Sequence, residues 1–259
     1  MKKASDEINL WIFDNFATSE ECQELLDLAN KKGYQASEVQ SLDDTTVEPS
    51  SGGIGSKKVI ARNSSTSFVG NIENENKDIL NTFTRNAKNA LKSLGKNGPG
   101  DQVDNVEIEG LQVQRYLPGQ KYNPHYDTFE DKESTQQRWW TVMIYLGPDD
   151  GLEGGSTYFP KIEKHVNPKQ GRAVIWNNLD SYFCRDVKTL HMGSEVKKGT
   201  KYVVTIWFRK PPGKKYMCRN RESFINPDFY QSKDPDNFNW WVFAFGTLFI
   251  ILIYYLLFS

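Results

Sequence analysis

The chain contains only three histidines, and two of them stand where a metal ion could use them. His125 and Asp127 form a His-x-Asp pair, and in an extended segment residues i and i+2 point to the same face. His191, on a later strand-like segment, would add a second imidazole. Two imidazoles and one carboxylate form the facial triad of non-haem Fe(II) oxygenases, which leaves positions open for a cosubstrate and dioxygen. The competing interpretation of the pair alone is a structural His–Asp contact in a turn.

A lysine follows His191 at the start of a run of β-branched and aromatic residues, Lys201 to Arg209. Alternation along a strand predicts one shared face for Lys201, Val203, Thr205, Trp207 and Arg209. An ammonium group at position 201 could pair with the distal carboxylate of a 2-oxoacid whose other end chelates iron. The competing interpretation is a solvated lysine at a strand start. The third histidine, His165, matches no ligand position and is predicted to lie in a loop.

The elements that must position these residues begin with two amphipathic helices. Thr18-Ser-Glu-Glu21 is a capping-box pattern that leads into apolar residues at helical spacing, and Gly33 suits the C-cap. A second helix is predicted from Ile79 to Leu94, where apolar residues again recur at helical spacing. Residues 41–58, between the helices, are polar and rich in Gly, Ser and Asp, which predicts a loop that could fold over a ligand.

The periodicity changes between Val106 and Arg209. Runs rich in β-branched and aromatic residues, separated by Pro, Gly and Asp turns, predict strands at 111–116, 141–146, 172–176 and 202–208, after an earlier strand candidate at 8–13. Many short strands preceded by helices predict a mainly β fold with bracing helices, a sandwich or jelly roll. The domain is expected to span residues 1–212, with its core at about 106–209.

Composition narrows the function classes. A net charge of -1 gives no general affinity for phosphate backbones, so nucleic acid is not an expected partner. The three cysteines are widely spaced and form no Cys-x-x-Cys pair, which argues against a disulfide scaffold or a zinc ribbon. Nothing near the N-terminus has the apolar core of a secretory signal peptide.

The C-terminal part is different in character. Residues 213–239 are polar and predict a linker, and residues 240–258 contain neither charge nor proline. That run approaches the roughly 20 apolar residues that cross a bilayer as a helix, and its Trp and Tyr residues suit the interfaces. We expect a single-pass tail anchor in a membrane such as that of the endoplasmic reticulum, with the lipid bilayer as a partner. The remainder of the chain would then face the cytosol by default.

Several motifs in order resemble the prolyl 4-hydroxylase family of Fe(II)/2-oxoglutarate-dependent dioxygenases. They are Gly110-Leu-Gln-Val-Gln-Arg-Tyr-Leu-Pro-Gly-Gln-Lys-Tyr-Asn-Pro-His-Tyr-Asp127, Gln137-Arg-Trp-Trp-Thr-Val-Met-Ile-Tyr-Leu146, Gly154-Gly-Ser-Thr-Tyr-Phe-Pro160, Pro168-Lys-Gln-Gly-Arg-Ala-Val-Ile-Trp176 and Leu190-His-Met-Gly-Ser-Glu-Val-Lys-Lys-Gly-Thr-Lys201. The resemblance extends over residues 9–209, including Ala61-Arg-Asn-Ser-Ser65. It implies a double-stranded β-helix, that is, a jelly roll.

The resemblance also implies roles for individual residues. His125, Asp127 and His191 would be the iron ligands, and Lys201 would bind the distal carboxylate of 2-oxoglutarate. Further residues match cosubstrate positions, namely Tyr116, Thr157 and Trp207, and others match positions that face a peptide substrate, namely Tyr122 and Arg138. The family often has His where this chain has Arg209, which changes the charge on the substrate side. For these residues other than the ligands and Lys201, ordinary barrel packing is the alternative.

The implied reaction is hydroxylation of peptidyl proline at the 4-position. It consumes O2 and 2-oxoglutarate, releases succinate and CO2, and uses L-ascorbate to rescue oxidised iron. Two alternatives stay open from the sequence. One is the same chemistry on another side chain or a small molecule, and the other is a non-catalytic, membrane-anchored binding protein that retains the fold.

Overall fold

The computed structural model describes residues 1–37, 63–70, 77–129 and 137–211. The backbone divides into residues 1–219 and 220–259, and all described residues belong to the first of these units. The predicted loop at 41–58, the linker at 213–239 and the membrane span at 240–258 lie outside the described residues. Within the described part of the chain, no helix combines the length and apolarity needed to cross a membrane.

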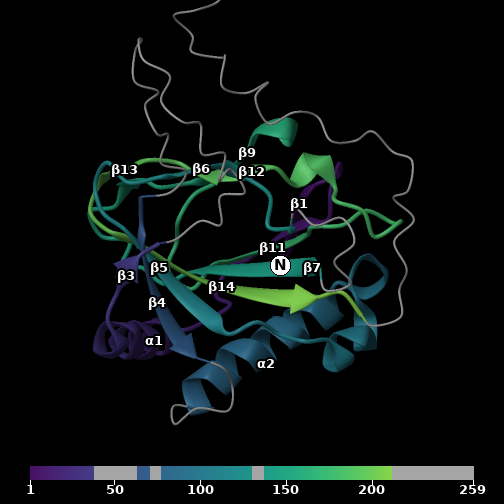
Figure 1. Cartoon of the computed structure of the whole chain (residues 1–259), viewed down its shortest axis with the longest axis horizontal. Helices are drawn as coiled ribbons and strands as arrows, with labels where there is room; N and C mark the ends of the chain where they lie inside the picture. The colour runs from purple at the N-terminus through teal and green to yellow at the C-terminus, as the bar shows by residue number, and fades with distance from the viewer. Residues whose placement is uncertain (38–62, 71–76, 130–136, 212–259) are drawn as a thin grey trace, which may run out of the picture. The chain divides into compact units, whose positions relative to one another are not determined.

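A large antiparallel sheet forms the middle layer of the domain (Figure 1). Its eight strands run in the order β1-β2-β11-β7-β14-β5-β4-β3. Their bounds are Lys2–Ser5 (β1), Leu10–Phe13 (β2), Ala173–Asn177 (β11), Arg138–Tyr145 (β7), Lys201–Arg209 (β14), Leu111–Tyr116 (β5), Ser65–Gly70 (β4) and Gln35–Ala36 (β3). The strands predicted at 111–116, 141–146, 172–176 and 202–208 are therefore confirmed to within a few residues.

A smaller sheet covers one face of the large sheet (Figure 1). Its four strands run in the order β10-β9-β12-β6, with bounds Lys164–Val166 (β10), Thr157–Phe159 (β9), His191–Gly193 (β12) and Tyr122–His125 (β6). A further pair joins β13 (Val196–Lys198) to β8 (Glu153–Gly154). Short 3₁₀ helices at Gly95–Asn97, Gly100–Asn105, Pro160–Ile162 and Val187–Thr189 connect the elements. Two facing antiparallel sheets are the arrangement of a jelly roll.

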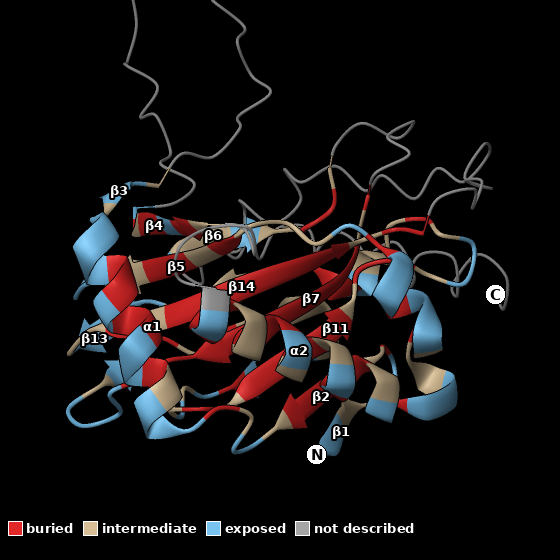
Figure 2. Ribbon diagram, turned by 90° about the horizontal axis from the view of Figure 1, so that it is seen from below, coloured by how far each residue is buried: buried red, intermediate tan, exposed pale blue. Residues whose placement is uncertain are grey.

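Two helices cover the opposite face of the large sheet. In α1 (Ser19–Lys32) the predicted capping box is present, because Glu21 N–H donates to Thr18 Oγ1 at 3.2 Å and Thr18 N–H donates to Glu21 Oε2 at 2.8 Å. The helix ends at Gly33, whose φ of 84° favours glycine. In α2 (Lys77–Ser93) the apolar residues are buried on the face toward the sheet, and the opposite face is exposed (Figure 2). The expectation of a mainly β fold braced by helices is thus confirmed.

Alternation along the strands separates two apolar cores. One core lies between the large sheet and the helices, and includes Val204, Ile206 and Phe208 of β14. The other lies between the two sheets, and includes Tyr116 of β5 and Val203 of β14. The face of β14 that begins with Lys201 therefore looks into the space between the sheets, which we call the barrel side. Cys22 is a buried free thiol in the helix-side core.

Candidate active site

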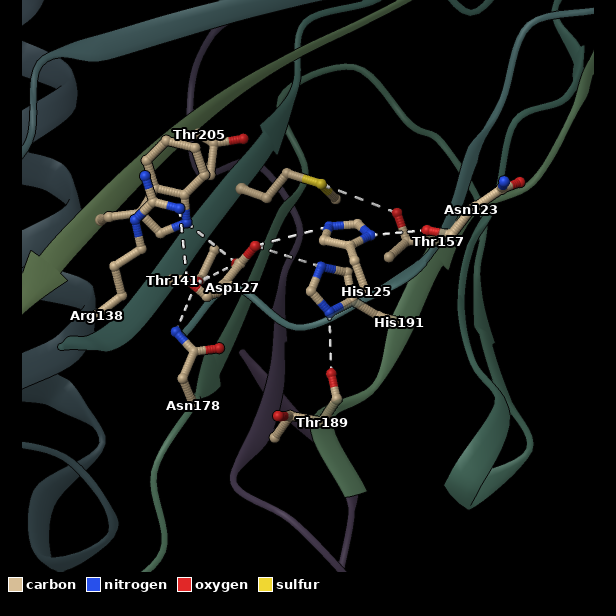
Figure 3. Close-up of polar contacts among 12 residues, drawn as sticks. Asn123, His125, Asp127, Arg138, Thr141, Thr157, Asn178, Thr189, His191 and Thr205 are labelled. Carbon is tan, nitrogen blue, oxygen red and sulfur yellow. Dashed lines mark hydrogen bonds and ion pairs between the residues drawn. The ribbon is translucent and has the colours of Figure 1, made fainter. Parts of the chain in front are cut away.

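The three candidate metal ligands come together at one end of the small sheet. His125 ends β6, Asp127 follows in a bend, and His191 opens β12 directly opposite His125 in the antiparallel register. One ligand atom from each residue lies within 4.8 Å of the other two. Each histidine Nε2 is 3.7 Å from Asp127 Oδ1 (Figure 3). Strand pairing therefore brings together ligands that lie far apart in the sequence.

Each imidazole is held through its other nitrogen. Nδ1 of His125 is 2.9 Å from the carbonyl oxygen of Asn123, and Nδ1 of His191 is 2.9 Å from that of Thr189. Because a carbonyl only accepts hydrogen bonds, each Nδ1 carries a proton and donates. In the neutral imidazole Nε2 then presents its lone pair toward the space beside Asp127, which is the tautomer that binds a metal ion. This donor set fits Fe(II).

Hydrogen bonds from the large sheet hold one oxygen of Asp127. The Thr141 hydroxyl donates to Oδ2 at 2.6 Å, and the indole N–H of Trp207 donates to the same oxygen at 3.1 Å. Thr141 in turn accepts a 2.8 Å hydrogen bond from the Asn178 amide (Figure 3). Oδ1 is left facing the two imidazoles, so the carboxylate is prepared to bind a metal through one oxygen.

Asp127 is only 7% exposed, and its surroundings decide its charge. Burial by itself raises the pKa of the carboxyl group. The charges of His191, His125 and Arg138 and the hydrogen bond from Thr141 outweigh burial and hold the pKa of Asp127 below its usual value. The group is therefore ionised at neutral pH, which is the form that binds a cation.

Side chains, rather than strand pairing, fix the backbone that carries Asp127. Among the described residues, none makes a backbone-to-backbone hydrogen bond to residues 127–129. The buried carboxamide of Gln137 accepts from Phe129 N–H at 2.8 Å and donates to the Phe129 carbonyl at 3.1 Å, as a neighbouring strand would. Arg185 donates to the Thr128 hydroxyl at 2.6 Å and to the same carbonyl at 3.2 Å. We call these contacts the 127–129 clasp.

Lys201 lies on the barrel side of the large sheet and is 3% exposed. Its Nζ is 5.2 Å from the ring centre of Tyr116 and 5.5 Å from that of Tyr145. Gly155 leaves room for the lysine, because an added Cβ there would lie 3.2 Å from Lys201 Cδ. An ammonium group enclosed by aromatic rings in this way is suited to binding a carboxylate.

Thr157 completes this part of the site. Its hydroxyl is 2.7 Å from the hydroxyl of Tyr145, which donates to the Val166 carbonyl at 2.9 Å. Burial raises the pKa of Tyr145, so the phenol stays protonated. Tyr116, Tyr145, Thr157 and Lys201 thus form one buried polar group on the barrel side.

Comparisons with known proteins agree with this geometry. A family model described as the 2OG-Fe(II) oxygenase superfamily matches residues 111–209. Prolyl 4-hydroxylase 5 of Arabidopsis thaliana is 32% identical over 219 residues, which cover 76% of this chain and 67% of the relative. A putative prolyl 4-hydroxylase of Acanthamoeba polyphaga mimivirus is 30% identical over 77% of this chain and 74% of its own length.

The chain belongs to the prolyl 4-hydroxylase family of 2OG-Fe(II) oxygenases. The crystal structure of viral collagen prolyl hydroxylase from Paramecium Bursaria Chlorella virus-1, in a 2OG complex, is similar with a TM-score of 0.59 and 27% identity. That match covers 77% of this chain and 95% of the viral chain. The chain is accordingly a 2-oxoglutarate-dependent dioxygenase, and the alternative of a non-catalytic protein is not supported.

Glu109 pairs with two arginines, Arg138 and Arg209. Both were expected on the side of the site that faces a peptide substrate. The Glu109 carboxylate pairs with Arg138 through both oxygens, at 2.6 Å to Nε and 2.7 Å to a terminal nitrogen. Arg209 Nε lies 3.0 Å from Glu109 Oε1, at an angle that makes an ion pair rather than a hydrogen bond. The two guanidinium groups lie 4.9 and 4.8 Å from the ring centre of Phe129. Arg138 also lies 3.6 Å over the ring of Trp207.

The structure brings most of the predicted site residues of this prolyl 4-hydroxylase relative together. Tyr122 stacks on the His125 imidazole at 3.6 Å, beside the candidate metal ligands. Trp207 was expected among the cosubstrate residues, and its indole N–H donates to Asp127. His165 lies in strand β10 rather than in a loop, where it stacks on Tyr158 at 3.9 Å and takes no part in the ligand group.

Several residues of the site were not singled out from the sequence. They are Glu109, Gln137, Thr141, Tyr145, Asn178 and Arg185. Alternation with Met143 and Tyr145 along β7 would have placed Thr141 on the barrel side. Its partner Asp127 follows a strand of the other sheet, and no sequence pattern predicts that contact.

Proposed function

We propose that this dioxygenase hydroxylates peptidyl proline at the 4-position, using O2 and 2-oxoglutarate and releasing succinate and CO2. One observation supports it most directly. On the barrel face of β14, the buried Lys201 stands at one end and Trp207, which contacts Asp127, stands toward the other. A dicarboxylate could therefore be held by the ammonium group at one end and by a metal ion at the other. The names of the relatives support proline as the target.

In this proposal His125, Asp127 and His191 hold Fe(II), which when bound supplies the redox chemistry with O2 and 2-oxoglutarate. The Nδ1–H groups of both histidines stay hydrogen-bonded to backbone carbonyls and keep the rings in place. Thr141 and Trp207 keep Asp127 Oδ2 occupied, which leaves Oδ1 for the metal ion. L-ascorbate is proposed as the reductant that restores oxidised iron.

Lys201 would hold the distal carboxylate of 2-oxoglutarate, with Tyr116 and Thr157 beside it. Tyr116 of the large sheet and Thr157 of the small sheet are both buried, so bulk water is excluded and the charge-assisted contact gains strength. Trp207 would border the cosubstrate where it approaches Asp127.

The peptide is proposed to approach from the side of Tyr122, Arg138 and Arg209. Tyr122 covers one face of the His125 ring and could contact the prolyl ring. The guanidinium groups of Arg138 and Arg209 are fixed by Glu109 and could donate to peptide carbonyls. The second candidate is the same chemistry on another side chain or on a small molecule, since Arg209 alters this surface relative to the usual His.

The test uses the purified full chain with Fe(II), 2-oxoglutarate and ascorbate. Succinate is measured with and without a panel of proline-rich peptides, and mass spectrometry locates one added oxygen. Peptide-stimulated succinate with 4-hydroxyproline, absent in His191→Ala, is the expected result. Slow succinate formation that no peptide stimulates would retain the oxygenase and reject these substrates. Omitting ascorbate should shorten the period of linear turnover.

We also propose that residues 240–258 attach the enzyme to a membrane, on the basis of their composition alone. The proposed orientation leaves the domain on the cytosolic side, for example at the endoplasmic reticulum. Fractionation of cells that express the full chain or a chain deleted for 240–258 tests this. Carbonate-resistant membrane association of the full chain only is expected, and equal release of both would contradict it.

A further inference from the structure

A glutamine is enclosed on the barrel side of the large sheet, between Lys201 and the candidate metal ligands. Gln114 of β5 is 3% exposed. Its Oε1 accepts a 3.1 Å hydrogen bond from the hydroxyl of Thr205 on β14. Its Nε2 makes no hydrogen bond to any described residue, yet it is not among the fully enclosed polar atoms that lack a partner. The amide N–H group therefore meets accessible space on the barrel side.

The strand register locates this carboxamide relative to the site. Tyr116 is paired with Lys201, and Gln114 is paired with Val203, one step further along the same face of β5 and β14. One step of two residues is about 7 Å along a strand. Thr205 follows Val203 on that face and precedes Trp207, which donates to Asp127. Along this face the Gln114–Thr205 pair therefore lies between the level of Lys201 and that of Trp207, which contacts Asp127.

The amide N–H group meets accessible space, so it can donate to water in the empty protein and to an oxygen of a bound ligand in the complex. If the oxygen and nitrogen of the Gln114 amide were assigned the other way round, one of the two groups would still make no hydrogen bond to the protein.

We propose that Gln114 is a cosubstrate-binding residue, whose amide donates a hydrogen bond to an oxygen of the 2-oxodicarboxylate that spans from Lys201 to the metal ion. This inference rests on the proposed use of 2-oxoglutarate at the same site. Thr205 is then a positioning residue, since its hydroxyl holds Oε1 and thereby directs the amide nitrogen.

The test measures cosubstrate affinity without turnover. The full chain is loaded with Mn(II) in the absence of O2 and titrated with 2-oxoglutarate by calorimetry. Gln114→Leu is expected to weaken binding about tenfold, or about 1.4 kcal/mol. Gln114→Glu should weaken it further, because a carboxylate would face a dicarboxylate. Gln114→Leu leaves the buried Thr205 hydroxyl without its acceptor, so the melting temperature of the metal-free variant should lie slightly below that of the wild type.

Two further variants serve as controls for this result. Gln35→Leu replaces an exposed glutamine of edge strand β3 and should leave 2-oxoglutarate affinity within about twofold. Thr205→Val keeps Gln114 but removes the hydroxyl donor to it, and should weaken binding about threefold. Thr205→Val and Gln114→Glu carry the test if Gln114→Leu does not fold.

The outcomes separate this inference from the proposed function. If the wild type does not bind 2-oxoglutarate, or if Lys201→Ala binds it equally well, the proposed function fails. If Lys201→Ala abolishes binding while Gln114→Leu binds as tightly as the wild type, only the role of Gln114 is overturned. Equal weakening by Gln35→Leu and Gln114→Leu would also overturn it.

Discussion

Thr141 donates a 2.6 Å hydrogen bond to Oδ2 of Asp127. Thr141 belongs to the large sheet, whereas Asp127 follows β6 of the small sheet, so this bond joins the two sheets at the candidate metal centre. It also determines which carboxylate oxygen faces the imidazoles. A contact between the two sheets therefore determines the orientation of Asp127, which the local sequence identifies only as a candidate ligand.

Thr141→Val is expected to weaken metal binding. The change removes the donor to Asp127 Oδ2 and the acceptor for the Asn178 amide, and loss of such a supporting contact costs about 10- to 100-fold in metal affinity. Mn(II) titration by calorimetry measures the effect. Thr141→Ser keeps the hydroxyl and should bind within about threefold of the wild type. Wild-type affinity in the valine variant would show that Trp207 alone is sufficient.

Gln137→Ala tests the 127–129 clasp. Loss of the two hydrogen bonds to Phe129 should free the backbone next to Asp127, weaken Mn(II) binding about tenfold and lower the free energy of unfolding by about 2 kcal/mol. Gln170→Ala is a matched control, because Gln170 also makes hydrogen bonds to a side chain and a carbonyl, those of Ser19 and Leu146. It should lose stability but keep metal affinity. Equal metal affinity in both variants would refute the clasp's role.

Arg209→Leu should affect the peptide and not the cosubstrate. The change removes one of the two cations that Glu109 and Phe129 hold, far along β14 from Lys201. We expect KM for a proline-rich peptide to rise about fivefold, or about 1 kcal/mol, with KM for 2-oxoglutarate unchanged. Steady-state kinetics with each substrate varied in turn separates the two constants. A matched rise in both would place Arg209 outside substrate recognition.

Cys22 predicts a loss of stability at alkaline pH. Burial raises the pKa of its thiol to about 11, from the ordinary value of 9.0 that applies to the unfolded chain. The stabilisation is fully present below about pH 9 and is lost between about pH 9 and 11, where only the unfolded chain releases the proton. In that window the free energy of unfolding of the wild type should fall by about 1.4 kcal/mol per pH unit more than that of Cys22→Ala. Urea unfolding at several pH values measures the difference, and parallel curves would contradict it.

The sequence determined the elements and the chemistry of the site. The capping box before α1 is local, so Thr18 and Glu21 predict it without knowledge of the rest. Alternation along β14 is also local, and it placed Lys201 and Trp207 on the same face. The His-x-Asp spacing identified both ligands, although Asp127 lies in a bend after β6 rather than in the extended segment that the sequence suggested. These features follow from spacing along one element.

Only the tertiary structure decided which residues support the ligands. The register between β6 and β12 sets His191 opposite His125, and the packing of one sheet on the other brings Thr141 and Trp207 to Asp127. Strand register and sheet packing depend on the burial of many side chains at once, which no short motif encodes. The position of Gln114 beside Thr205 was also decided by the tertiary structure, because it results from the pairing of two strands far apart in the chain.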